Sequence, residues 1–266
     1  MADRSATEVR AALARQPLTV VGRLVSASNA TLLCTLELHG LETRCVYKPV
    51  AGERPLWDFP TATLARREVA TGVLAAAFGL ALVPPTVWRD GGPFGAGMCQ
   101  LWIEDAEGGA DVDVVPPDEI PPGWLVSVTG MDGGHREVAV VHADRPELRE
   151  LALFDIVVNN ADRKGGHIMR SPDGVLHAID HGVTFHVEDK LRSVLWGWAG
   201  IELTVPEIAR LESIGEQLRG ELAEQLGEWL AGAEIKAVRR RIRNLVRDGR
   251  FPSPSGEWPS VPWPVF

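Results

Sequence analysis

Residues 155–182, with the sequence DIVVNNADRKGGHIMRSPDGVLHAIDHG, decide the fold that the chain is expected to adopt. The apolar pattern that leads into this stretch predicts a helix over 145–158. A hairpin is predicted over 168–179, because the turn sequence SPDG separates two short strand-like runs. Asp162 follows the helix, and Asp180 follows the hairpin 18 positions later. The two aspartates therefore bracket one hairpin and are expected to converge on one cleft.

A pair of carboxylates in this arrangement suits phosphoryl transfer. One carboxylate can orient an attacking hydroxyl group and accept its proton, while the other holds a divalent metal ion against nucleotide phosphates. The plainer interpretation is that both aspartates are ordinary loop residues, because Asp-Arg pairs and Asp-X-Gly turns are common in loops. Taken alone, the stretch favours the plainer interpretation, so the rest of the chain has to decide.

The first hundred residues have the pattern of a small antiparallel sheet. A helix over 5–15 is predicted from the capping box that Ser5 and Glu8 form. The Gly- and Pro-rich residues 51–60 form a loop, and a second helix follows over 62–78. Five strands are predicted, near 18–26, 31–38, 43–49, 83–89 and 96–103. We therefore expect a five-stranded sheet with one helix inserted after its third strand.

Two charged side chains of this region also fit phosphoryl transfer. Lys48 stands near the end of the third strand, in VYKP, and Glu68 lies among apolar residues on the second helix. A glutamate near an apolar helical face needs a partner, and in kinases a helical glutamate positions a strand lysine on nucleotide phosphates. The alternative is that Lys48 points to solvent, as strand lysines usually do. The small polar turn SASNAT would let backbone N–H groups approach phosphates, although it lacks glycine. Its candidate residues are Ser26, Ser28 and Asn29.

The acidic, proline-rich stretch 104–123 is the best candidate for a boundary between two lobes. Beyond it, the pattern predicts a strand near 137–141, two amphipathic helices over 206–230 and 233–248, and an irregular Pro-rich tail. The expected organisation is an N-terminal lobe over 1–104, a C-terminal lobe over 105–252 and the tail over 253–266.

Taken in order, these segments resemble the phosphatidylinositol 3-/4-kinase superfamily, and most of all the type II phosphatidylinositol 4-kinases and their bacterial relatives. The matching pieces, which span roughly residues 20–200, are VYKP, RREVATGVLAAAFGL, VPPT, GPFGAGMCQLWIED, FDIVVNNADRKGGHIM, AIDHGVTF and SVLWGWAG. The resemblance implies an α+β, two-lobed protein-kinase-like fold, with a small antiparallel β-sheet N-lobe carrying one helix, a mostly helical C-lobe and an ATP cleft between them.

The resemblance also implies roles for single residues in an ATP-dependent kinase that acts on an alcohol group. Lys48 would contact ATP, with Glu68 as its helical partner. Asp162 would be the catalytic aspartate and Asp180 the metal aspartate, and the implied cofactors are ATP and Mg²⁺ or Mn²⁺. We further expect Arg163 to steady the loop or to screen charge on the transferring group. The segment that contacts adenine would be Gln100, Leu101, Trp102 and Ile103.

The chain departs from the kinase pattern at His167, which stands five positions after Asp162. Kinases usually have an asparagine metal ligand there. Histidine suits Mn²⁺ better than the oxygen-preferring Mg²⁺, or else His167 packs at the start of the strand. The large C-lobe insertions and the cysteine-rich palmitoylation segment of lipid kinases are absent, so membrane-lipid specificity does not carry over. The acceptor stays open between an inositol lipid, a metabolite and a protein, and the alternative is a pseudokinase or nucleotide-binding regulatory module.

Composition limits the partners, the cysteine sites and the cellular location that the chain is expected to have. The net charge of −9, from 27 basic and 36 acidic residues, argues against a nucleic-acid partner. The three cysteines, Cys34, Cys45 and Cys99, lack a metal-ligand spacing, so neither a disulfide framework nor a zinc site is expected. No apolar run has the length of a membrane span and MADRSATEVR is not a signal peptide, so we expect a cytoplasmic protein. The basic final helix leaves peripheral membrane contact open, although a solvated face is the plainer explanation.

Overall fold

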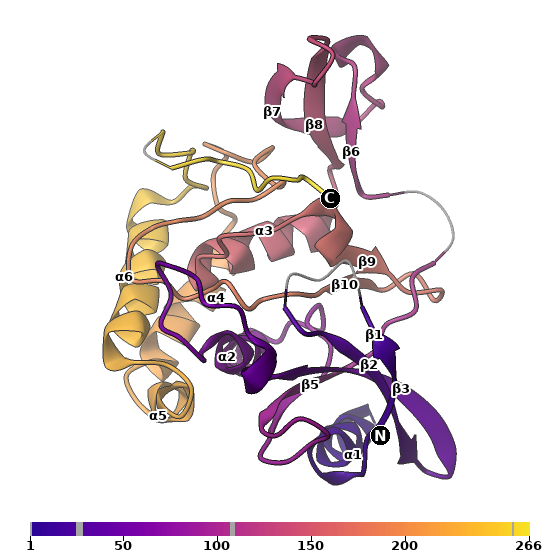
Figure 1. Cartoon of the computed structure of the whole chain (residues 1–266). Coiled ribbons are helices and arrows are strands. Elements are labelled where there is room, and N and C mark those ends of the chain that lie inside the picture. Colours follow the sequence, from indigo (N-terminus) through magenta and orange to yellow (C-terminus); the bar gives the residue numbers. More distant parts are fainter. Residues whose placement is uncertain (1, 25–28, 107–109, 257) are drawn as a thin grey trace.

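The computed structural model describes residues 2–24, 29–106, 110–256 and 258–266. Its N-terminal part is an antiparallel five-stranded sheet, as predicted, and the strand order is β1-β2-β3-β5-β4. The strands are β1 (Thr19–Arg23), β2 (Leu32–Leu38), β3 (Leu41–Pro49), β4 (Thr86–Arg89) and β5 (Gly97–Leu101). The sheet and its helices occupy the lower part of Figure 1.

Two helices cover opposite faces of this sheet. Side chains alternate between the faces of a strand, so neighbouring residues of β3 meet different helices. Tyr47 packs in the cluster beneath α1 (Ala2–Arg15), whereas Lys48 lies opposite Met98 of β5. Met98 in turn packs with residues of α2 (Leu64–Ala77). Strand alternation therefore directs Lys48 to the face that α2 occupies.

A second sheet follows the first lobe and lies on the far side of the C-lobe from it (Figure 1). It is antiparallel, in the order β6-β8-β7, and its strands are β6 (Val112–Val115), β7 (Trp124–Met131) and β8 (Glu137–Ala143). We expected a strand only near 137–141. The first of the missed strands, β6, is only four residues long and lies among acidic and proline residues, which hide a strand pattern.

The rest of the chain is mainly helical, with a short hairpin of β9 (Ile168–Arg170) and β10 (Leu176–Ala178). The helix predicted over 206–230 is wrong in one respect, because it is two helices. Leu218 closes the first, and Gly220, a poor helix former, is the N-cap of the second. The helices are α3 (Pro146–Val158), α4 (Val205–Gln217), α5 (Glu221–Gly227) and α6 (Gly232–Asp248). Short 3₁₀ turns occur at Val50–Gly52, Pro117–Glu119 and Gly165–His167.

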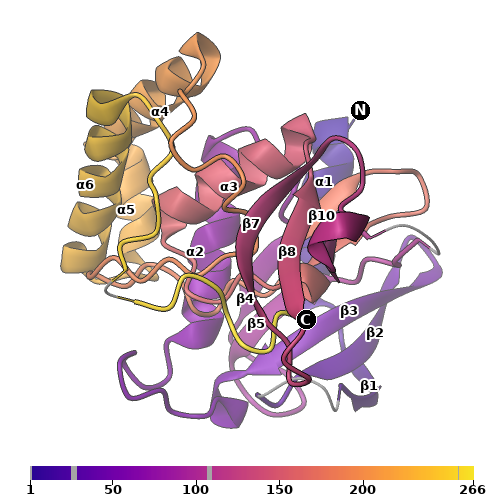
Figure 2. The ribbon, with the colours of Figure 1, turned by 90° about the horizontal axis from the view of Figure 1, so that it is seen from above.

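The N-lobe has its own two hydrophobic clusters, and α2 also contributes to the large core of the C-lobe. The end of α2 enters the C-lobe core, where Phe78 meets Phe154 of α3 edge to face, with ring centroids 5.5 Å apart. The Pro-rich tail has no helix or strand over its described residues and runs across the C-lobe, as Figure 2 shows from above. Its Ser260 carbonyl accepts from the Ser193 amide at 2.9 Å. None of the helices in the described part of the chain combines the length and the hydropathy that a bilayer span requires.

Candidate active site

Lys48 stands where the two lobes meet. Its Nζ lies 2.5 Å from Oε1 of Glu68 on α2 and 3.0 Å from Oδ1 of Asp180, which follows β10. Only 18% of the Lys48 side chain is exposed. One ammonium group therefore joins a carboxylate of the N-lobe to a carboxylate of the C-lobe, which brings together three residues that the sequence had singled out.

Glu68 is buried, with 2% of its side chain exposed, and it uses both of its oxygens. While Oε1 meets Lys48, Oε2 accepts the backbone N–H of His181 at 3.0 Å. The neighbouring Arg67 is also buried; it donates to the carbonyl of Thr184 and pairs with Glu234 of α6. These contacts hold α2 against the loop after β10. Arg67 was missed in the sequence, where the only sign of its role was its position next to Glu68 on an apolar helix.

Asp180 has an unusual backbone conformation. Its φ of +56° lies in the left-handed region, which few residues other than glycine adopt. Such residues concentrate at functional sites, because the surrounding structure has to maintain them. The side chain remains 46% exposed, and its Oδ2 lies 3.5 Å from Nε2 of His167. Asp180 is thus partly open to solvent, with Lys48 on one oxygen and His167 near the other.

Arg163 belongs to the interior rather than to the cleft. Its side chain has no exposed surface and forms a bidentate pair with Asp155, with Nε–Oδ2 at 2.8 Å and Nη2–Oδ1 at 3.1 Å. It also donates to the Ile179 carbonyl at 2.9 Å and to Nε2 of His181 at 2.7 Å. Of the two roles expected for Arg163, these contacts fit the steadying of the loop, since a buried and fully engaged guanidinium cannot reach a transferring group. Asp155 was missed, although it is a carboxylate on an apolar helix.

Asp162 lies at the edge of the same loop, with 29% of its side chain exposed. Its backbone N–H donates to Oδ1 of Asn160 at 3.0 Å, and its carboxylate lies 3.7 Å from Nζ of Lys164. Burial raises the pKa of Asp162, and the charges of Lys164 and Arg192 offset this only in part. A carboxylate with a raised pKa is a better proton acceptor than an ordinary aspartate.

The charged groups around Lys48 shift one another's pKa values, although burial outweighs Lys48 at Glu68 and raises the pKa of that carboxyl. Burial acts to lower the pKa of Lys48, but the Asp180 and Glu68 carboxylates outweigh it and raise the pKa. Burial likewise acts to raise the pKa of Asp180, and the Lys48 ammonium holds it well below the usual range. Burial lowers the pKa of His167 to about 4, so its imidazole is neutral at pH 7. A neutral imidazole and an ionised carboxylate are the protonation states that metal ligands require.

The donor set at this point fits a divalent cation that is also held by phosphates. Asp180 supplies a carboxylate and His167 an imidazole nitrogen, 3.5 Å apart. Within the described ranges, no group of three or more His, Cys, Asp or Glu side chains could hold a metal ion. In nucleotide sites Mg²⁺ is usually held by one or two carboxylates together with substrate phosphates, and here the imidazole of His167 would stand beside a single carboxylate.

The segment expected to contact adenine is the end of β5. Gln100 is buried, and its side-chain amide donates to Oγ1 of Thr86 at 2.7 Å, so that amide is engaged within the sheet. The backbone N–H groups of Leu101 and Trp102 donate to carbonyls of neighbouring segments, and Ile103 is half-buried. The adenine role of this segment stays a prediction.

The turn expected to approach phosphates is described only at its end. Ser26 and Ser28 lie outside the described residues. Asn29 accepts the backbone N–H of Arg54 on its Oδ1 at 2.8 Å. This contact ties the turn after β1 to the loop that follows β3.

In sequence, the chain is 46% identical over 265 residues to Protein Rv2133c of Mycobacterium tuberculosis (strain ATCC 25618 / H37Rv). The alignment covers 96% of this chain and 95% of that protein. No protein-family model matches the chain.

Solved structures resemble the chain in fold. The structure of hydra Fam20 with sugar superposes with a TM-score of 0.60 at 15% identity, covering 92% of this chain and 88% of that one. The Golgi casein kinase with Mn/ADP bound gives a TM-score of 0.57 at 14% identity, covering 92% and 75%. At such low identity the likeness shows the fold alone. It confirms the predicted kinase-like α+β fold with an antiparallel N-terminal sheet and a helical C-terminal part.

Proposed function

This chain belongs to the family of Protein Rv2133c of Mycobacterium tuberculosis, and we propose that it is an ATP-dependent kinase that transfers the γ-phosphoryl group to an alcohol. The observation that carries the proposal is the position of Lys48, whose ammonium contacts Glu68 from one lobe and Asp180 from the other. Phosphoryl transfer depends mainly on positioning and on electrostatic stabilisation, and this arrangement supplies both.

Each residue then has a distinct task. Glu68 orients Lys48, and Lys48 binds phosphate oxygens. Asp180 and His167 hold the divalent cation, Mg²⁺ or Mn²⁺, and when ATP is bound with its cation it supplies the activated phosphoryl group. Asp162 orients the acceptor hydroxyl and accepts its proton, in keeping with its raised pKa. Arg163 positions the loop through its buried pair with Asp155.

We assign the enzyme more narrowly to the phosphatidylinositol 3-/4-kinase-like type. The seven matching segments in their shared order support this, since they include the VYKP lysine, the N-x-D-R loop and the I-D-x-G motif. Type II phosphatidylinositol 4-kinases and their bacterial relatives have the nearest pattern. ATP is the proposed phosphoryl donor and an alcohol group is the proposed acceptor. The screen described below is designed to identify the molecule that carries this alcohol. We expect the protein to act in the cytoplasm and without nucleic acid.

The test is a transfer screen with γ-labelled ATP against pools of protein, inositol lipid and soluble metabolites, each with Mg²⁺ and with Mn²⁺. Label in an organic product, absent with Asp162→Asn, supports the kinase. A second candidate function is that of a nucleotide-binding regulatory module. It is favoured by His167, which stands where kinases usually have an oxygen ligand. If ATP binds in a metal-dependent way while no pool is labelled, the chain is a nucleotide-binding regulatory module instead.

A further inference from the structure

A cavity of about 470 Å³ lies in the C-lobe, between α3, α6, the segment 189–200 and the tail. Its volume is in the range of pockets that hold small ligands. Neither Lys48 nor Asp180 lines it. The cavity is therefore distinct from the site described above.

One wall of the cavity is apolar. Leu191 and Trp196 contribute to this wall from the segment that follows Asp180. Phe251 and Pro254 contribute to it from the start of the tail. Trp196 is buried, and its indole N–H donates to the Ser260 carbonyl at 2.7 Å, so the tail is held in place over the cavity. These surfaces suit the aliphatic or aromatic body of a ligand.

A buried cation also lines the cavity. Arg241 of α6 lines the cavity with only 6% of its side chain exposed. Its Nε donates to the Val157 carbonyl at 3.0 Å and its Nη1 to the His186 carbonyl at 3.2 Å. Its Nη2 is buried and has no hydrogen-bond partner among the described residues. Burial lowers the pKa of Arg241 to about 10, so the guanidinium is still charged at pH 7.

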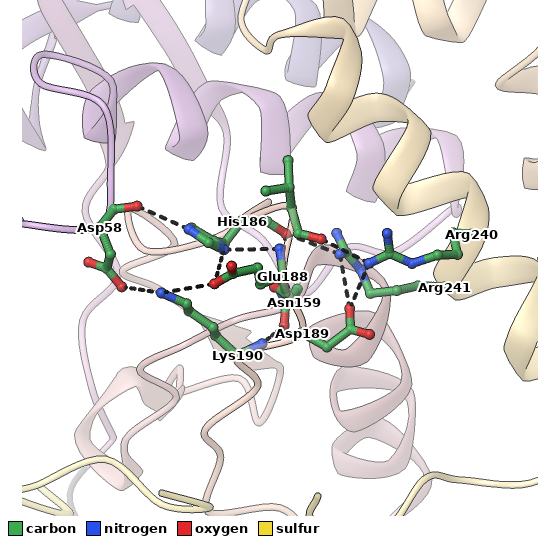
Figure 3. A network of polar contacts seen from close by, with 9 residues as sticks. Asp58, Asn159, His186, Glu188, Asp189, Lys190, Arg240 and Arg241 are labelled. Atoms are coloured by element: carbon green, nitrogen blue, oxygen red, sulfur yellow. Dashed lines mark hydrogen bonds and ion pairs between the residues drawn. The ribbon is translucent and has the colours of Figure 1, made fainter. Parts of the chain in front are cut away.

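The charge of Arg241 is only partly neutralised. The nearest carboxylate is that of Asp189, 3.5 Å from Nη1, and Asp189 also pairs with Arg240 at 3.2 Å. Figure 3 shows both guanidinium groups directed at this single carboxylate, which is itself 62% exposed. A buried charge that shares its counter-ion with another cation favours an additional anion.

The other charged groups of the lining leave this surplus in place. Asp248 is paired with Arg247, which lies outside the lining, at 2.7 Å. Arg250 adds a second cation, with a carboxylate of Glu202 no closer than 4.0 Å. Trp258 contributes a second buried donor, since its Nε1 has no hydrogen-bond partner in the part of the chain that the structure describes. Two cations, Arg241 and Arg250, and two carboxylates, Asp189 and Asp248, thus line the cavity together with the apolar wall.

We propose that this cavity binds a small amphipathic anion, a carboxylate or phosphate monoester carried on an apolar body. The acid group lies toward Arg241, which supplies a charge-assisted hydrogen bond. The apolar body lies against Leu191, Trp196 and Phe251. The inference does not depend on the proposed kinase activity, because it concerns binding at a separate place.

Titration calorimetry on the full chain tests it with four probes: octanoate, octyl phosphate, octanol and inorganic phosphate. At least one of the two alkyl anions is expected to bind saturably, about tenfold or more tighter than octanol and inorganic phosphate, because only the anions use both walls. Octanoate and octyl phosphate separate a carboxylate ligand from a phosphate ligand.

Three variants locate the binding. Ser253→Trp places a bulky ring on an exposed lining position and should abolish binding of the alkyl anion. Arg241→Gln should remove the preference for the anion over octanol. Arg243→Gln is the matched control, because Arg243 is exposed on the same helix and does not line the cavity. It should bind as the unaltered chain does.

The proposal is overturned if neither alkyl anion binds, if octanol binds as tightly as the anions, or if Ser253→Trp binds like the unaltered chain. Should Arg241→Gln fail to fold, the comparison with octanol and the Ser253→Trp variant still decide. ATP binding, measured in the same instrument, keeps this outcome separate from that of the kinase proposal.

Discussion

The ammonium group of Lys48 contacts one carboxylate from each lobe. Glu68 is buried and depends on Lys48 and on the His181 amide for its compensation. Removing one member of a buried ion pair leaves the other charge uncompensated, which costs more than the pair itself contributes. Asp180 also pairs with Lys48, but 46% of its side chain is exposed, so water can solvate part of its charge. The pair with Glu68 therefore matters for the fold as well as for the proposed phosphate contact.

The first prediction concerns Lys48→Ala. The variant loses a charge-assisted contact with phosphates, so ATP affinity or turnover should fall at least about tenfold, on the order of 1.4 kcal/mol. Calorimetric titration with ATP and metal measures the affinity. Lys236→Ala is the control, because Lys236 is an exposed lysine of α6. Unchanged ATP binding together with unchanged turnover in Lys48→Ala would show that Lys48 does not contact the nucleotide.

His167 offers a second prediction at this scale. If its imidazole is a ligand, activity should favour Mn²⁺ over Mg²⁺, because a nitrogen donor suits Mn²⁺ better than the oxygen-preferring Mg²⁺. His167→Asn restores an oxygen ligand and should shift the preference toward Mg²⁺. Turnover of both proteins with each metal gives the answer. If His167 only packs beside the hairpin, the ratio of the two activities will be the same in both proteins.

Among the elements, the three-stranded sheet is joined to the segment 194–198 through polar contacts. The Ser127 hydroxyl of β7 donates to the Val194 carbonyl at 2.5 Å. On β8, Nε2 of the buried His142 accepts the Gly197 amide at 3.1 Å, and its Nδ1 lies 3.0 Å from the Ala143 carbonyl. This pattern requires the neutral imidazole, with one nitrogen as donor and the other as acceptor.

Stability should therefore depend on pH through His142. Burial lowers its pKa in the folded state, so below about pH 6.5 the unfolded chain takes up a proton that the folded chain does not. Stability is full above that pH and is lost as the pH falls. Urea unfolding between pH 7 and pH 5 should show this loss, and His142→Gln should reduce it. His135→Asn, at an exposed loop position, should leave it as it was. An equal loss in His142→Gln would contradict the assignment.

The elements also show what a sequence can and cannot predict. The five-stranded sheet and the hairpin of β9 and β10 were predicted because their patterns and turns are local. The Lys48 and Glu68 positions were found for the same reason, since a charged residue on an apolar element needs a partner. Arg67 was missed because its partners come from distant segments, up to 167 positions away. Asp155 was missed although its partner Arg163 is only eight positions away, because the Asp155–Arg163 contact forms only when the chain turns back after α3. Only the folded chain brings such groups together.

At the scale of the whole molecule, the two lobes are held together at several places on both sides of α2. The loop after β3 reaches the C-lobe, where Asp58 pairs with Lys190 at 2.8 Å and accepts from Nε2 of His186 on its carbonyl (Figure 3). A second contact between the lobes joins α2 to the loop after β10, where Glu68 accepts the backbone N–H of His181. These contacts fix the positions of the charged groups around Lys48, which is the preorganisation that the proposed phosphoryl transfer requires.

The central claim, that this arrangement transfers a phosphoryl group, is tested most directly by comparing two variants. Asp162→Asn should bind ATP and metal like the unaltered chain but transfer no γ-label, because it lacks the proton acceptor. Asp180→Asn should weaken the metal-dependent part of ATP binding. The measurement is transfer of γ-labelled phosphate, with calorimetric ATP binding measured in parallel. Normal transfer by Asp162→Asn, or an equal loss of metal-dependent binding in both variants, would contradict the account.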